Sequence, residues 1–170
     1  MTIEFTDVLP HDFNFIPILI SGKDSLFLKG IEYLIIVQDD LSKRVYEIRY
    51  EFHCNSFKQA ILIRDILAVG HEGHFYLFNV ATNTNVLIQK MTGYFGHIYI
   101  DDEQLYVSDA MGIYCIDKGG SIHWRNSNLG IDGIIITVFD NEKLLGSGEW
   151  DPPGGWRDFI LDKRTGIKIT

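Results

Sequence analysis

The sequence predicts an all-β protein, a propeller-like array of about four antiparallel four-stranded sheet units. Short runs of β-branched and aromatic residues recur between Gly, Asn and Asp, and no stretch shows the sustained apolar period of a long helix. Asp39, Asn79, Asp117 and Asp162 recur 38–45 residues apart. A period near 40 with several short strands per unit is typical of propeller blades. An antiparallel β-sandwich with coincidental periodicity is the alternative.

The repeated unit ends on a common plan. An apolar strand leads to the recurring Asp or Asn, a polar turn follows, and a short strand completes the unit. The Asp or Asn side chain suits this position because it can accept a hydrogen bond from the backbone about two residues on. The units are expected to form a single domain with approximate boundaries at 9–52, 53–91, 92–128 and 129–170.

Two earlier strands complete each predicted unit. In the first unit they are Phe15–Ile20 and Ser25–Lys29. The N-terminal run Thr2–Val8 is then left over, and we expect it to pair with an edge of the first or last unit and cover the backbone there. The later units offer Gln59–Ile63 and Ile66–Gly70, then Gly96–Ile100 and Gln104–Ser108, and finally Gly133–Phe139 and Lys143–Gly148.

One loop departs from the repeat. The segment 149–156 contains two prolines and two glycines, which cannot continue a strand pair. In a four-stranded blade, the turns between the second and third strands share one face with the links between blades. This face gathers the most varied side chains, and loops on a rigid sheet often carry function. We therefore predict a partner-binding site of acidic and aromatic residues there: Glu72, Asp109, Glu149, Trp150, Asp151 and Trp156.

Charge and cysteine content narrow the functional classes. The 170 residues carry a formal net charge of −8, which argues against a nucleic-acid partner and favours a basic protein partner. The N-terminus lacks the basic and apolar regions of a signal peptide, and no apolar run has the length of a membrane span. Two cysteines, Cys54 and Cys115, make no disulfide framework. These features predict a cytoplasmic protein that does not act at a membrane.

Catalytic and cofactor motifs are missing from the sequence. It contains no G-x-S-x-G, no G-x-G-x-x-G and no P-loop, so we predict a protein that is not an enzyme and holds no cofactor. His71 and His74 are three residues apart, unlike the pair of H-E-x-x-H, and Asp101–Glu103 lacks the spacing of a calcium loop. We therefore predict no bound metal.

The repeat and the segment 148–156, Gly-Glu-Trp-Asp-Pro-Pro-Gly-Gly-Trp, resemble small propeller-like bacterial immunity proteins of contact-dependent growth inhibition and other polymorphic toxin systems. The resemblance implies a non-catalytic cytoplasmic protein that binds a cognate toxin domain and neutralises it. An acidic inhibitor suits a basic, nuclease-type toxin, because opposite charges accelerate encounter. We expect a monomer in a 1:1 complex. The alternative function is a small-ligand or carbohydrate-binding propeller, with or without enzymatic activity.

Overall fold

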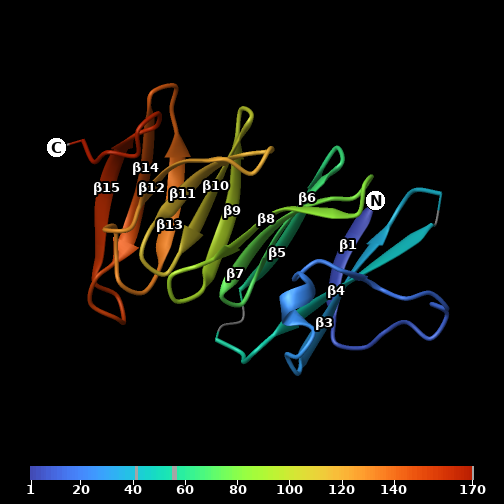
Figure 1. The fold of residues 1–170 in the computed structure, drawn as a ribbon. Coiled ribbons are helices and arrows are strands. Elements are labelled where there is room, and N and C mark those ends of the chain that lie inside the picture. Colours follow the sequence, from blue (N-terminus) through green and yellow to red (C-terminus); the bar gives the residue numbers. More distant parts are fainter. Residues whose placement is uncertain (41, 55–56, 170) are drawn as a thin grey trace. The chain divides into compact units, whose positions relative to one another are not determined.

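The computed structural model describes residues 1–40, 42–54 and 57–169, and these residues form strands, turns and one short 3₁₀ helix, with no α-helix among them (Figure 1). The 3₁₀ helix η1 is Lys23–Ser25. The strands in chain order are β1 (Thr2–Thr6), β2 (Ile18–Leu19), β3 (Gly30–Val37), β4 (Lys43–Tyr50), β5 (Lys58–Ile63), β6 (Ile66–His71), β7 (His74–Asn79), β8 (Thr84–Lys90), β9 (Phe95–Asp101), β10 (Gln104–Asp109), β11 (Ile113–Asp117), β12 (Ile122–Asn126), β13 (Ile134–Phe139), β14 (Lys143–Glu149) and β15 (Trp156–Asp162).

The strands form four small sheets, in place of the two sheets of a sandwich. The strand orders are β1-β3-β4-β2, β5-β6-β7-β8, β12-β11-β10-β9 and β13-β14-β15. The second and third sheets are simple meanders, in which each strand pairs with its neighbours along the chain. The prediction of an all-β, propeller-like protein is confirmed.

The chain divides into two compact units. The first comprises Met1–His53, Ala60–Ala68 and Tyr76–Ile88, and the second comprises Cys54–Gln59, Val69–Phe75 and Gln89–Thr170. In the first unit, Leu34, Tyr46 and Ile48 are fully buried, and the rings of Tyr46 and Phe78 meet edge to face with centroids 5.8 Å apart. Apolar burial of this kind is the main driving force for folding.

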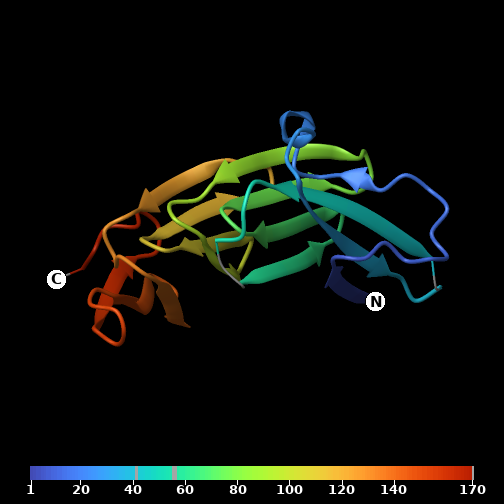
Figure 2. The ribbon, with the colours of Figure 1, turned by 90° about the horizontal axis from the view of Figure 1, so that it is seen from below.

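The second unit contains the third and fourth sheets, which lie side by side (Figures 1 and 2). Alternate residues of each strand point to one face of its sheet, and here that face is apolar. One buried cluster joins the two sheets: Tyr106, Ile113, Cys115, Trp124, Leu129, Ile134, Ile136, Leu144, Phe159 and Leu161. This core fixes the turns and links at the two ends of both sheets.

The recurring turn residue acts as the sequence predicts in three units. The Asn79 side chain accepts the backbone N–H groups of Ala81 and Thr82, at 2.9 and 3.0 Å. Asp117 accepts the N–H of Ser121, and Asp162 accepts the N–H groups of Arg164 and Thr165. In the first predicted repeat, residues 9–52, the residue after Asp39 accepts the backbone hydrogen bond instead. Asp40 accepts the N–H of Ser42 at 3.0 Å, whereas Asp39 accepts the N-terminal ammonium.

The first sheet differs from the predicted unit. Ser25–Lys29 is not a strand, because residues 23–25 form η1, and the prediction for this segment is wrong. The N-terminal strand β1 pairs with β3 instead, from Thr2 opposite Val37 to Thr6 opposite Tyr33. The leftover strand therefore takes the place of the missing second strand, which confirms its pairing with the first unit. The predicted strand Phe15–Ile20 shrinks to β2, which pairs in parallel with β4.

The fourth sheet has three strands. The predicted last strand, Ile167–Ile169, makes a single bridge between Lys168 and Leu161, and the Ile169 N–H donates to the Ile160 carbonyl at 2.7 Å. The polar turn that precedes it is formed as expected. The chain thus begins the fourth strand without extending it into a full ladder.

We predict that Asn79→Ala lowers the free energy of unfolding by about 1–2 kcal/mol, because two backbone N–H groups lose their acceptor. Asn79→Asp keeps the acceptor and should stay within about 0.5 kcal/mol of the parent protein. Urea unfolding followed by circular dichroism measures both variants. Equal losses in the two variants would show that the side-chain acceptor does not stabilise this turn.

We predict that Asp162→Asn flattens the dependence of stability on acid pH. The Thr165 hydroxyl and backbone N–H groups hold the pKa of Asp162 below its usual value. The ionised carboxylate therefore contributes stability above the unfolded-state pKa, and this contribution is lost as the pH falls through the folded-state pKa. Urea midpoints measured from about pH 5 to about pH 2 should fall less in Asp162→Asn than in the parent. Thr165→Ala should be intermediate, and unchanged slopes in both variants would contradict the assignment.

Candidate functional site

Turns and links of the second unit meet at one end of its sheets. The link after β8 donates to the turn after β6, from Phe95 N–H to the Glu72 carbonyl at 2.7 Å. The link after β12 donates from Leu129 to the Met111 carbonyl at 3.1 Å and from Ile131 to the Glu149 carbonyl at 2.7 Å. These bonds agree with the sequence argument that second-to-third-strand turns and inter-sheet links share one side.

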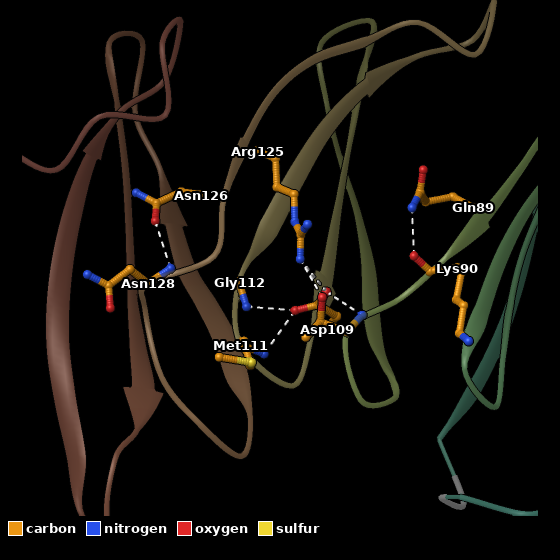
Figure 3. Close-up of polar contacts among 9 residues, drawn as sticks. Gln89, Lys90, Asp109, Met111, Gly112, Arg125, Asn126 and Asn128 are labelled. Atoms are coloured by element: carbon orange, nitrogen blue, oxygen red, sulfur yellow. Dashed lines mark hydrogen bonds and ion pairs between the residues drawn. The ribbon is translucent and has the colours of Figure 1, made fainter.

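Asp109 is fully buried at the end of β10 and holds two segments together (Figure 3). Its Oδ1 accepts the N–H groups of Met111 and Gly112, at 2.9 and 2.7 Å. Its Oδ2 accepts the N–H of Thr92 at 2.9 Å, and the Arg125 guanidinium lies 3.7 Å from the same oxygen. A buried carboxylate with this many donors fixes its own turn and the preceding link. It offers no surface to a partner.

Glu72 is the first residue of the turn after β6 and is 6% exposed. Its Oε2 accepts the N–H of Cys54 in the preceding link at 2.6 Å. Burial, followed by the hydrogen bond and charge of Glu72, raises the pKa of the Cys54 thiol to about 11. The structure therefore places two of the six predicted site residues, Glu72 and Asp109, in supporting positions beneath the surface.

Glu149, at the end of β14, is half-buried and braces the inserted loop. Its Oε1 accepts the N–H of Gly154 at 2.7 Å, and the Trp150 N–H donates to the Gly155 carbonyl at 3.0 Å. Gly154 has a φ of +106°, a backbone conformation that L side chains rarely adopt, so the loop closes at a glycine. The loop is thus held by its own hydrogen bonds in one shape.

The two tryptophans of this loop have different surroundings. Trp150 is half-buried, and the Arg157 guanidinium lies over its ring, 5.6 Å from the centroid. Trp156 is 42% exposed, and Asp151 is also exposed. Trp150 therefore packs the loop, whereas Trp156 and Asp151 remain available for contact.

Four further residues join this surface, and the sequence analysis missed them: Phe57, Tyr94, Ile131 and Asp132. The Tyr94 hydroxyl donates to the Asp132 carbonyl at 2.8 Å and contacts its carboxylate at 3.1 Å. Burial, followed by this hydrogen bond, raises the pKa of Tyr94 to about 12. The rings of Tyr94 and Phe57 lie 6.2 Å apart, and Phe57 is 48% exposed. The sequence signal that could have identified this group is the presence of aromatic residues, Phe57 and Tyr94, in the links between sheets.

Trp156 and Tyr94 both lie close to Gly133, so Trp156 belongs to the same surface. A methyl group added at Gly133 would lie 3.6 Å from the Trp156 ring and 3.7 Å from the Tyr94 hydroxyl. The residues brought together are thus aromatic and acidic, with one exposed isoleucine beside Asp132. We call them the link surface: Phe57, Tyr94, Ile131, Asp132, Asp151 and Trp156.

The histidines of the neighbouring turn provide no metal cluster. Within residues 1–40, 42–54 and 57–169, no group of three or more His, Cys, Asp or Glu side chains converges on one point. Burial, with the nearby charge of Lys90, lowers the pKa of His74 and so favours its neutral form. Over the same residues, no helix has the length and apolar character needed to cross a membrane.

Comparison with known proteins gives the fold alone. No protein-family model matches the sequence, and the search of curated proteins gave no match. The computationally designed Ika8 protein is similar in structure, with a TM-score of 0.54 and 13% identity over 85% of this chain and 46% of that one. BamB from Moraxella catarrhalis, a β-propeller, has a TM-score of 0.53 and 14% identity over 81% of this chain and 42% of its own. The chain therefore spans less than half the length of either structure.

We predict that Asp109→Ala lowers the free energy of unfolding by about 2–4 kcal/mol, because buried donors lose a charged acceptor. The exposed Asp151→Ala is the matched control and should change stability by less than about 0.5 kcal/mol. Thermal and urea unfolding of both variants gives the comparison. A loss at Asp109 no larger than that at Asp151 would contradict the supporting role.

Proposed function

We propose that the protein is a non-catalytic immunity protein that binds a cognate, basic toxin domain through the link surface and neutralises it in the cytoplasm. The observation that carries this proposal is the combination of an exposed Trp156 with exposed carboxylates on a backbone braced by hydrogen bonds to Glu149 and Asp109. Rigid aromatic anchors are enriched at binding hot spots. Prior bracing of a surface also reduces the entropy lost on association.

Charge supports a basic partner for this surface. The chain carries a formal net charge of −8, and no cation pairs with Asp132 or Asp151 among the described residues. Unpaired surface carboxylates attract a basic partner over distances comparable with the Debye length, about 8 Å at physiological salt. We propose a 1:1 complex of the monomer with the toxin domain, whose own active site the link surface covers.

The test uses the reading frame next to that of this protein, which the proposal expects to encode the toxin. Its C-terminal domain is expressed in cells with and without the protein, and growth and pairwise binding are measured. Protection from growth arrest together with a saturable 1:1 complex is the expected result. Absence of both protection and binding, with the protein folded, would reject the proposal.

Variants of the link surface locate the contact. Asp151→Lys should slow association, and the loss should shrink at high salt, because rim charges steer encounter. Trp156→Ala should instead accelerate dissociation, with a loss on the order of 2 kcal/mol or more. Glu142→Lys, on an exposed turn at the opposite end of the sheets, is the charge-matched control and should bind as the parent does. A loss confined to Glu142→Lys would place the contact at the other end.

A further inference from the structure

A cavity of about 630 Å³ opens at the other end of the third and fourth sheets, within the second unit. The link surface contributes no residue to it. It is bounded by β10, β11 and β12 and by the turns that follow β13 and β15. Its volume falls within the range of about 300–1,000 Å³ that holds small organic ligands in proteins.

The floor of the cavity is a row of three cross-strand neighbours. Tyr106 pairs with Cys115, and Cys115 pairs with Trp124, so the three side chains lie on the same face of the third sheet. Trp124 is 9% exposed, and its indole N–H donates to the Lys163 carbonyl at 3.0 Å. The ring centroids of Tyr106 and Trp124 are 5.9 Å apart. The floor is therefore aromatic and held in place.

One wall carries an ion-pair group in which one ammonium faces two carboxylates. The Lys163 ammonium contacts the carboxylates of Asp101 and Asp102 and, at 3.3 Å, the Asp140 carbonyl. The hydrogen bond that Lys163 donates to Asp101 is the main reason that the pKa of Lys163 is raised. Lys163 thus spans from the turn after β15 to the turn after β9, and one of the two carboxylate charges in this group stays unbalanced beside the cavity.

The remaining wall mixes hydrogen-bond donors and acceptors. Gln104 and Asn141 supply amides, Glu142 an acceptor and Arg164 a donor. The His123 imidazole lies 3.2 Å from the Asp117 carboxylate. A cation is bound best by acceptor groups alone, and an anion by donor groups alone. A hydroxyl group donates and accepts at once, so a ligand with several hydroxyl groups matches this mixture.

We propose that this cavity binds a neutral sugar, with its hydroxyl groups on Gln104, Asn141, Glu142 and Arg164 and with Trp124 at the buried base of the cavity. An aromatic floor beneath convergent polar groups is the usual composition of a small-molecule site. This site is separate from the proposed toxin contact and does not depend on it.

The experiment is a titration of the isotopically labelled protein with maltose, cellobiose and lactose, followed by ¹H–¹⁵N NMR. The Trp124 indole N–H reports from the floor, and the backbone amides of residues 141–142 and 163–164 report from the wall. Saturable shifts of these signals with at least one disaccharide are the expected result. The double variant Asn141→Ala/Glu142→Ala should weaken that binding at least tenfold, since both side chains are exposed and the fold does not depend on them.

The matched control is Ser127→Ala/Asn128→Ala, an exposed polar pair in the link after β12, which should bind the sugar as the parent does. No saturable shift with any of the three disaccharides would overturn the proposal. Shifts confined to Trp150 and Trp156, or binding that the cavity variant leaves unchanged, would do the same. If tetramethylammonium or inorganic phosphate shifts the cavity signals and the sugars do not, the cavity selects an ion, which also rejects the proposal. Toxin binding measured on the same variants separates this outcome from the outcome of the immunity test.

Discussion

A buried carboxylate that accepts a backbone N–H from the preceding link is the contact on which the second unit depends. Glu72 holds Cys54 in this way, and Asp109 holds Thr92. Asp109 is the last residue of β10, and Glu72 is the first residue after β6, so two neighbouring positions of the same turn serve this purpose in the two sheets. Leaving such a charge buried without donors would cost several kcal/mol, and the link is therefore tied to the turn whenever the sheet is folded. A strand meander becomes an ordered series of sheets because its links are held at these points.

The fourth sheet uses the same position differently, and this change creates the exposed surface. The backbone carbonyl of Glu149 accepts the link N–H of Ile131, while its side chain turns to Gly154 in the inserted loop. The link is still held, but by main-chain atoms alone. The carboxylate is thereby released to brace a loop that the other sheets lack, and the loop carries Trp156 outward beside Asp132 and Tyr94.

The sequence predicts the parts of this fold that are governed by local chemistry. The turns at Asn79, Asp117 and Asp162 could be predicted because the side chain bonds backbone only two to four residues on. Local chemistry also misleads at Asp40, where the role shifts by one residue, and at Ser25–Lys29, whose place β1 fills from far along the chain. The burial of Glu72 and Asp109 could not be predicted, because an acidic residue in a polar turn is expected to be exposed. Only the folded structure shows the backbone N–H groups, distant in sequence, that these carboxylates accept. The contact between Tyr94 and Asp132 spans 38 residues and leaves no periodic trace.

Both ends of the second unit carry acidic groups, and the ends differ in what surrounds those groups. At the end that holds the cavity, Lys163 pairs with Asp101, and Lys118 pairs with Glu103. Glu142 and Asp162, which also line the cavity, have no ion-pair partner among the described residues, so this end keeps unpaired acids as well. At the link surface, Asp132 and Asp151 belong to the same patch as the aromatic rings, and among the described residues no cation forms an ion pair with either carboxylate. In the free protein these exposed carboxylates are hydrated, and beside apolar area they add long-range attraction for a basic surface, on which the proposed toxin contact rests.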